Sequence, residues 1–176
     1  MKVLAYCGLL AVVFSVLVRA AEQPSNPSDV ATINALHAYF AAEAHGPQPP
    51  LPRVHLVISG HSGPPHDFAV ELATTPAEQR TGLMFRTTIP SGTGMLFDWG
   101  TPQEEPMWTK NCPIAEDMIF ISADGTITHI AKDTAPESKA EISSERPVRA
   151  TLEVQGGLTA KLDIRVADKV WGAIFK

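Results

Sequence analysis

The chain has 176 residues, of which 44% are hydrophobic and 19% are charged, and its formal net charge is −5 at pH 7. This length and composition are typical of one globular domain with additional segments, and they exclude collagen-like, repetitive and wholly disordered chains. The acidic balance argues against nucleic acid as a partner, because binding to phosphates depends on a surplus of basic residues.

The N-terminus has the pattern of a secretory signal peptide. Lys2 is followed by an uncharged apolar run, Val3 to Val18, and by the cleavage-site pattern that ends at Ala20. We therefore expect residues 1–20 to be removed and the protein to be exported, periplasmic or secreted, with membrane contact only through this segment. Its removal would change the net charge from −5 to −7. An uncleaved anchor is the alternative, although the run is shorter than the roughly 20 residues of a spanning helix.

Residues 21–52 are predicted to form a short helix and a connector. Asn26 to Asp29 supplies a capping residue, an early proline and an acid, and apolar residues then recur at helical spacing up to about Ala44. The proline-rich sequence from Gly46 to Pro52 favours an extended connector. We expect the principal domain to begin at Arg53.

Residues 53–176 are predicted to form a mainly β domain, because short β-rich segments alternate with turn signals. This spacing predicts a compact sandwich, jelly-roll-like or barrel-like fold with short helices. One helix should begin at the capping box Thr75 to Glu78 and continue through Leu83 and Met84, and a second should run from Leu158 to Leu162. The expected strands are 54–59, 68–73, 94–99, 106–109, 118–122, 126–131, 148–154 and 169–174.

The clearest local prediction is a β-hairpin between the fifth and sixth of these strands. Asp124–Gly125 favours a two-residue turn with positive φ at both positions, and this turn would place Phe120 opposite His129. Along residues 148–155, apolar and polar residues alternate. We therefore expect one face of that strand to lie in the core and the other to meet water or a cleft.

Three motifs occur in a specific order: Arg80-Thr81-Gly82-Leu83-Met84-Phe85-Arg86, Gly94-Met95-Leu96-Phe97 and Met107-Trp108-Thr109-Lys110-Asn111. With the stretch from Ala150 to Gly157, they make the chain resemble the bacterial and archaeal domain-of-unknown-function 192 family from Phe68 to Val170. The resemblance implies a compact mainly β domain, often behind a signal peptide, and no established activity. Residues that differ from those usual in this family are Cys112 for threonine, Gln155 for asparagine, and Asp163 and Ala167 for glycine.

Trp108, Lys110 and Asn111 are the strongest candidates for a ligand site. An indole can stack on a ligand, an ammonium group can contact an anion, and an amide both donates and accepts hydrogen bonds. On a strand, Trp108 and Lys110 would share a face, and Arg80 or Arg86 would add positive charge if the fold brings them near. These groups suit a polar small molecule or a sugar. The alternative is a buried tryptophan with its neighbours at a solvated edge.

Two arrangements would support a small exported hydrolase. Asp117 and Glu153 form a candidate carboxylate pair, although Asp117 could instead pair with Lys132 or Lys110 and Glu153 could lie on the wet face of its strand. Cys112 could act as a nucleophile with a histidine as base. No signature links it to a histidine, and a lone cysteine is more often a small buried hydrophobe.

The remaining patterns indicate structure rather than chemistry. His55, His61 and His66–Asp67 match none of the compact zinc spacings, and we expect a loop there, no metal and no cofactor. The sequence therefore predicts an exported binding or accessory domain for a small polar ligand. A hydrolase is one alternative, and a protein-interaction module that docks the helix from Asp29 to Ala44 on an unidentified partner is another.

Overall fold

A computed structural model of the protein describes residues 45–60, 63–172 and 174–175. The chain divides into two compact units, Met1–Glu43 and Ala44–Lys176. The predicted signal peptide and N-terminal helix lie outside the described residues. Within those residues, no helix has both the length and the hydropathy needed to cross a membrane.

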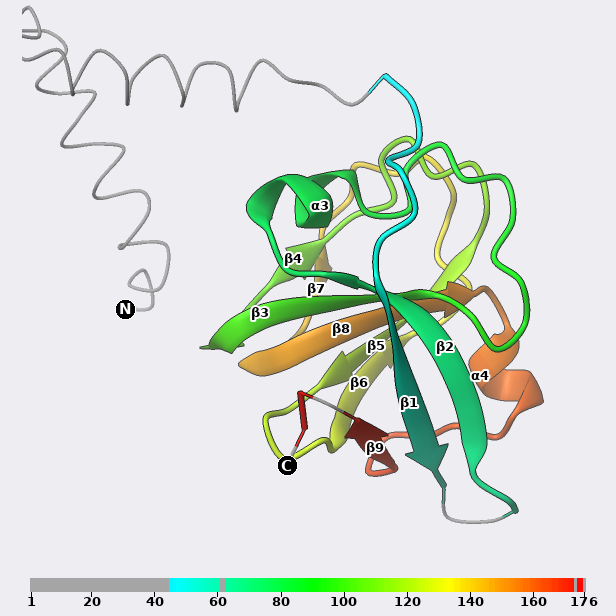
Figure 1. Ribbon diagram of the computed structural model, residues 1–176, viewed down its shortest axis with the longest axis vertical. Coiled ribbons are helices and arrows are strands. Elements are labelled where there is room, and N and C mark those ends of the chain that lie inside the picture. Colours follow the sequence, from blue (N-terminus) through cyan, green and yellow to red (C-terminus); the bar gives the residue numbers. More distant parts are fainter. Residues whose placement is uncertain (1–44, 61–62, 173, 176) are drawn as a thin grey trace, which may run out of the picture. The chain divides into compact units, whose positions relative to one another are not determined.

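The unit from Ala44 onward is mainly β, as predicted, and is built on a curled seven-stranded sheet (Figure 1). Neighbouring strands in this sheet are antiparallel except for β2 and β3, which are parallel. The sheet order is β6-β5-β8-β3-β2-β1-β9, and β4 and β7 form a separate pair. The strands are β1 (Arg53–Ser59), β2 (His66–Ala73), β3 (Met95–Gln103), β4 (Pro106–Met107), β5 (Glu116–Ile121), β6 (Ile127–Ala131), β7 (Ile142–Ser143), β8 (Val148–Gln155) and β9 (Lys169–Gly172).

Two short helices follow strands of the large sheet. Helix α3 (Pro76–Thr81) lies in the crossover between the parallel strands β2 and β3, where a connection longer than a hairpin turn is required. Its predicted capping box is present, because Thr75 and Glu78 exchange side-chain and backbone hydrogen bonds. Helix α4 (Leu158–Lys161) follows β8. Both helices are therefore found where the sequence predicts them, although α3 ends before Leu83.

The proline-rich stretch before β1 packs on the domain. The Gln48 side chain donates hydrogen bonds to the carbonyl oxygens of Glu78 and Gly82, at 3.1 and 2.9 Å. The backbone N–H of Leu51 donates to the Glu71 carboxylate at 2.8 Å. This stretch is thus part of the compact unit, which begins before the expected boundary at Arg53.

The two edges of the curled sheet meet near the turn between β5 and β6. Ile127 N donates to Asp168 O and Ala167 N donates to Ile127 O, both at 2.9 Å. Val170 N donates to Gly125 O at 2.8 Å. Gly125 has φ of +78°, and a Cβ there would clash with the Val170 carbonyl, so this junction requires glycine. These bonds give the sheet a barrel-like curl.

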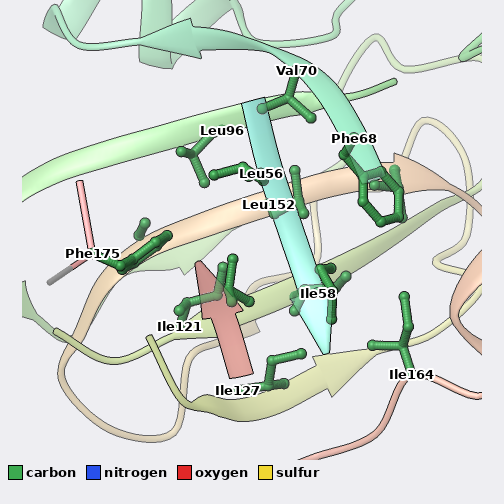
Figure 2. Close-up of a cluster of buried hydrophobic side chains, with 14 of the residues drawn as sticks. Leu56, Ile58, Phe68, Val70, Leu96, Ile121, Ile127, Leu152, Ile164 and Phe175 are labelled. Carbon is green, nitrogen blue, oxygen red and sulfur yellow. The ribbon is translucent and has the colours of Figure 1, made fainter. Parts of the chain in front are cut away.

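The concave side of the sheet holds the main hydrophobic core. Side chains from β1, β2, β3, β5, β6 and β8 point toward one another in this core, together with residues that follow α4 (Figure 2). Burial of these side chains stabilises the fold by about 25 cal/mol for each Å² of apolar surface removed from water. The labelled members are Leu56, Ile58, Phe68, Val70, Leu96, Ile121, Ile127, Leu152, Ile164 and Phe175.

The convex side of β3, β5 and β8 is also buried, which the alternation along residues 148–155 did not predict. A second hydrophobic cluster covers it with side chains from the connecting segments, including Leu83, Ile89 and Met107. Because of this cover, Thr151 and Glu153 of β8 are buried rather than facing water. The expectation that this face of the strand meets water is therefore wrong at these two positions, although Gln155 at the end of the strand is exposed.

The hairpin has the predicted register but a different turn. Phe120 pairs with His129, as predicted. Only Gly125 has positive φ, and its N–H donates to Ser122 O at 3.0 Å, so a type I turn is followed by a glycine bulge. The bulge shifts the register beyond Phe120, so that Ile121 pairs with Ile127.

Candidate functional site

The cluster of Trp108, Lys110 and Asn111 lies in a turn rather than on a strand. Strand β4 ends at Met107, and Cys112 N donates to Thr109 O at 3.0 Å, which closes a turn over Lys110 and Asn111. Trp108 and Lys110 therefore do not share a strand face. Trp108 is 48% exposed, so the alternative of a buried tryptophan is also wrong.

Asn111 connects this turn to the loop after α3. Its φ is +58°, a conformation that asparagine tolerates better than most residues. Its carbonyl oxygen accepts a hydrogen bond from Phe85 N at 2.7 Å, and its side-chain amide lies 3.8 Å from the Met84 sulfur. Asn111 therefore supports the backbone of residues 84–85.

Asp117 and Glu153 lie on opposite faces of the sheet, so the structure does not form the predicted carboxylate pair. Asp117 is paired with Val154 across the ladder, and Glu153 is paired with Met118. Because successive strand residues point to opposite faces, the two carboxyl groups cannot act on one substrate atom. Acid and base chemistry by this pair is excluded by the register.

Asp117 has a structural environment. The carboxylate is buried and accepts hydrogen bonds from Asp133 N, Gly157 N, Thr159 N and the Thr159 hydroxyl, at 2.6 to 2.9 Å. Burial raises the pKa of Asp117, but the hydrogen bonds from Thr159, Asp133 and Gly157 outweigh it and hold the pKa below its usual range. The bond to Asp133 N takes the place of the expected pairing with Lys132.

Glu153 lies in a buried cluster with Glu116 and Cys112, away from Asp117. Glu116 precedes Met118 by two residues on β5, so its side chain is on the same convex face as that of Glu153. Both residues are buried, and among the described residues no N–H or O–H group donates to either Glu116 oxygen, whose neighbouring donor is the weak Cys112 thiol. Burial raises the pKa of Glu116 to about 7, and burial together with the charge of Glu116 raises the pKa of Glu153 well above its usual value.

Cys112 is buried next to these carboxyl groups. Burial raises the pKa of the Cys112 thiol, and the negative charges of Glu116 and Glu153 raise it further. A nucleophilic cysteine needs the opposite environment, in which positive charge favours the thiolate. The environment of Cys112 therefore does not support the nucleophile that the sequence left open.

Arg86 forms a partly buried ion pair with Glu71 of β2. Its Nη1 and Nη2 atoms donate to the two Glu71 carboxylate oxygens, each at 2.9 Å, and the side chains are 21% and 7% exposed. Burial raises the pKa of Glu71, but the hydrogen bonds from Arg86 and Leu51 and the positive charges of Arg86 and Arg53 lower it overall. The buried Arg86 Nε has no acceptor among the described residues.

This ion pair forms part of a pocket of about 390 Å³ beside β2. Its wall combines two arginines, Arg53 and Arg86, with apolar side chains and three threonines from the segment between α3 and β3. The lining of this pocket includes Arg86 from the predicted site but not Arg80, Trp108, Lys110 or Asn111. Arg80 lies at the end of α3, where burial lowers the pKa of its guanidinium.

Phe85, which lines the pocket, has φ of +63°. A bulky residue rarely adopts this left-handed conformation, which costs about 1–2 kcal/mol. The hydrogen bond from Phe85 N to Asn111 O helps to hold it. Such strained residues cluster at binding sites and active sites, because selection for function maintains them.

Sequence reasoning missed Glu71, Phe85 and Glu116 as site residues. The motif Phe85–Arg86 was visible, but nothing in it predicts a positive φ. Glu116 could have been found as one of two adjacent acids, with Asp117, that precede the apolar run Met118–Ile121. Across the described residues, no three His, Cys, Asp or Glu side chains come together in a way that could hold a metal ion.

The fold is that of a small mainly β domain, in which loops cover the convex face of a curled sheet. The chain belongs to the DUF192 family, described as Uncharacterized ACR, whose model matches residues 57–171. A search of curated proteins found no match.

Two similar crystal structures share this fold. A protein of Sinorhizobium meliloti 1021, described as a "putative transcription regulator", is 36% identical with a TM-score of 0.69, and the match covers 71% of this chain and 97% of that one. A protein of unknown function from Novosphingobium aromaticivorans DSM 12444 is 38% identical with a TM-score of 0.67, covering 74% and 94% of the two chains.

Proposed function

We propose that the protein is an exported binding or accessory domain whose small polar ligand occupies the pocket beside β2. The observation that carries this proposal is the strained Phe85, next to an Arg86 that is fixed against Glu71 in the pocket wall. The proposal for export rests on the N-terminal signal-peptide pattern.

Phe85 combines a positive φ with a bulky side chain and a place in the wall of the pocket. The left-handed backbone turns the chain between Leu83 and Thr87, so that Phe85 and Arg86 both line the pocket. The bidentate pair with Glu71 restricts the rotamers of Arg86, which reduces the entropy that a ligand must overcome on binding. Strain combined with a restricted arginine is typical of a preorganised binding site.

The pocket has the composition of a small-molecule site. Its volume of about 390 Å³ falls within the range of roughly 300–1,000 Å³ usual for such sites. Apolar side chains such as Leu83 and Ile89 form part of the wall, and hydroxyl groups and guanidinium groups supply a few polar contacts. This combination holds a ligand by its apolar surface and orients it by hydrogen bonds.

In this proposal the residues predicted from sequence have unequal roles. Arg86 lines the pocket, whereas Asn111 acts through Phe85, whose N–H it binds, and is a positioning residue. The role of transcription regulator, which the description of the Sinorhizobium meliloti protein gives to that protein, is not proposed for this chain, because its net charge of −5 argues against binding to nucleic acid phosphates.

The direct test is a titration of the isotopically labelled protein, followed by the chemical shifts of its backbone amides, with acetate, butyrate, inorganic phosphate, glycerol and glucose as probes. We expect at least one probe to shift the amides of Phe85, Arg86 and Thr93. Arg86→Lys should weaken the binding of that probe about tenfold, whereas the exposed control Arg165→Lys should leave its affinity unchanged. Shifts confined to Trp108 and its neighbours, or no shifts with any probe, would contradict the proposal.

A further inference from the structure

The charges in the pocket leave one arginine available for a ligand. Both oxygens of Glu71 accept hydrogen bonds from Arg86, and Oε2 accepts another from Leu51 N at 2.8 Å. The negative charge of Glu71 is therefore balanced and its acceptor positions are largely occupied. Arg53 also lines the pocket, is exposed, and has no ion pair within 4.0 Å among the described residues.

The charged residues that line the pocket carry a net charge of +1. Arg53 and Arg86 contribute two positive charges and Glu71 contributes one negative charge. The protein as a whole is acidic, with a net charge of −5, so long-range attraction for anions is absent. An anion would therefore be held by local contacts. A ligand with a single negative charge matches the net charge of the pocket lining better than a ligand with two negative charges.

The uncharged part of the wall indicates what accompanies that charge. Leu83, Phe85 and Ile89 present apolar surface, and the exposed residues Thr87 and Thr88 present hydroxyl groups. A hydrocarbon segment of a ligand would be removed from water against the first group, which contributes about 25 cal/mol for each Å² buried. A bare inorganic anion would leave this apolar surface unused.

Building on the proposed function, we infer that the pocket takes a small organic monocarboxylate with a short apolar chain, and that Arg53 contacts its carboxylate. A guanidinium group presents two parallel N–H donors that match the two oxygens of a carboxylate. Arg86 then shapes the wall while it remains bound to Glu71, and Arg53 supplies the charge that selects the ligand.

The test compares butyrate with butyramide, which has the same shape but no charge, and with inorganic phosphate. Binding is measured from the backbone amide shifts of Phe85, Arg86 and Thr93 in the full-length mature protein. We expect butyrate to bind the wild type at least tenfold more tightly than butyramide does. Arg53→Gln should weaken the binding of butyrate about tenfold and leave the binding of butyramide unchanged. Arg165→Gln, a surface variant outside the pocket, should change the affinity for neither probe.

The outcomes separate this inference from the proposed function. If butyramide or glucose shifts the pocket amides and Arg53→Gln does not weaken butyrate, the pocket binds ligands but the carboxylate assignment is wrong. If phosphate binds more tightly than butyrate, the apolar chain is not recognised and the assignment is also wrong. If no probe shifts these amides, both the inference and the proposed function are contradicted. Arg53 is exposed, and circular dichroism of Arg53→Gln checks that the variant is folded.

Discussion

Glu116 should make the protein less stable as the pH rises from acidic to neutral. Burial raises the pKa of this carboxyl group from 4.5 to about 7, against a small opposing effect of the Cys112 thiol, and no N–H or O–H group of the described residues donates to its oxygens. Between these two pH values, the folded state holds a proton that the unfolded state has released. The free energy of unfolding therefore falls with increasing pH in this window and is constant with respect to this group above it.

The size of the effect follows from the pKa difference. Each pKa unit corresponds to about 1.4 kcal/mol, so the shift from 4.5 to about 7 costs the folded state about 3 kcal/mol at pH 8. Glu116→Gln keeps the shape of the side chain and removes the ionisation. We expect the variant to be more stable than the wild type by about 3 kcal/mol at pH 8 and by much less at pH 4.5.

Urea denaturation at a series of pH values, followed by tryptophan fluorescence, measures this difference. Glu141→Gln removes an exposed carboxylate and serves as the control, with no pH-dependent gain expected. Glu153→Gln should give a gain of the same sign, because burial and the neighbouring Glu116 raise the pKa of Glu153 as well. Parallel stability curves for the wild type and Glu116→Gln from pH 4.5 to 8 would show that Glu116 does not hold a proton in the folded protein in this range.

Three further predictions follow from single residues. Asp117→Asn should lower the free energy of unfolding by about 3 kcal/mol at pH 7 in urea denaturation, because the amide cannot accept all four hydrogen bonds, and a loss below about 1 kcal/mol would contradict this role. Ala167→Gly should raise the free energy of unfolding by about 1 kcal/mol, because φ is +78°, whereas Ala160→Gly in α4 should lower it; thermal denaturation of both variants decides. Cys112 should react with a thiol reagent at neutral pH only at the rate of unfolding, and rapid labelling of the folded protein would show that it is accessible and ionised.

Local signals in the sequence predicted most of the fold. Each of the eight expected strands is present, and the hairpin register at Phe120 and His129 is as predicted. Thr75 and Glu78 correctly indicate the start of α3, because a capping box satisfies backbone donors within four residues of sequence. Such features depend on neighbours in the chain and are visible without knowledge of tertiary contacts.

Two departures from the family pattern fall at positions with positive φ. Asp163 and Ala167 stand where the family usually has glycine, and both have positive φ, at +56° and +78°. The turn geometry is therefore retained although the residue that favours it has been replaced. A resemblance can supply this kind of backbone information, which composition and periodicity do not contain.

The candidate site was harder to predict because it depends on distant contacts. Glu153 was expected on the solvent-exposed face of its strand, but segments from elsewhere in the chain bury that position. The pairing of Arg86 with Glu71 joins residues 15 positions apart on different elements, and the positive φ of Phe85 depends on a hydrogen bond to Asn111. Neither feature has a signal in the local sequence.

A crystal structure of the protein grown with butyrate would show whether the Phe85–Arg86 segment forms a ligand pocket beside β2. We expect a positive φ at Phe85, Arg86 paired with Glu71, and butyrate in the pocket with its carboxylate on Arg53. An ordinary negative φ at Phe85 together with an empty pocket, or butyrate bound beside Trp108 instead, would contradict this expectation.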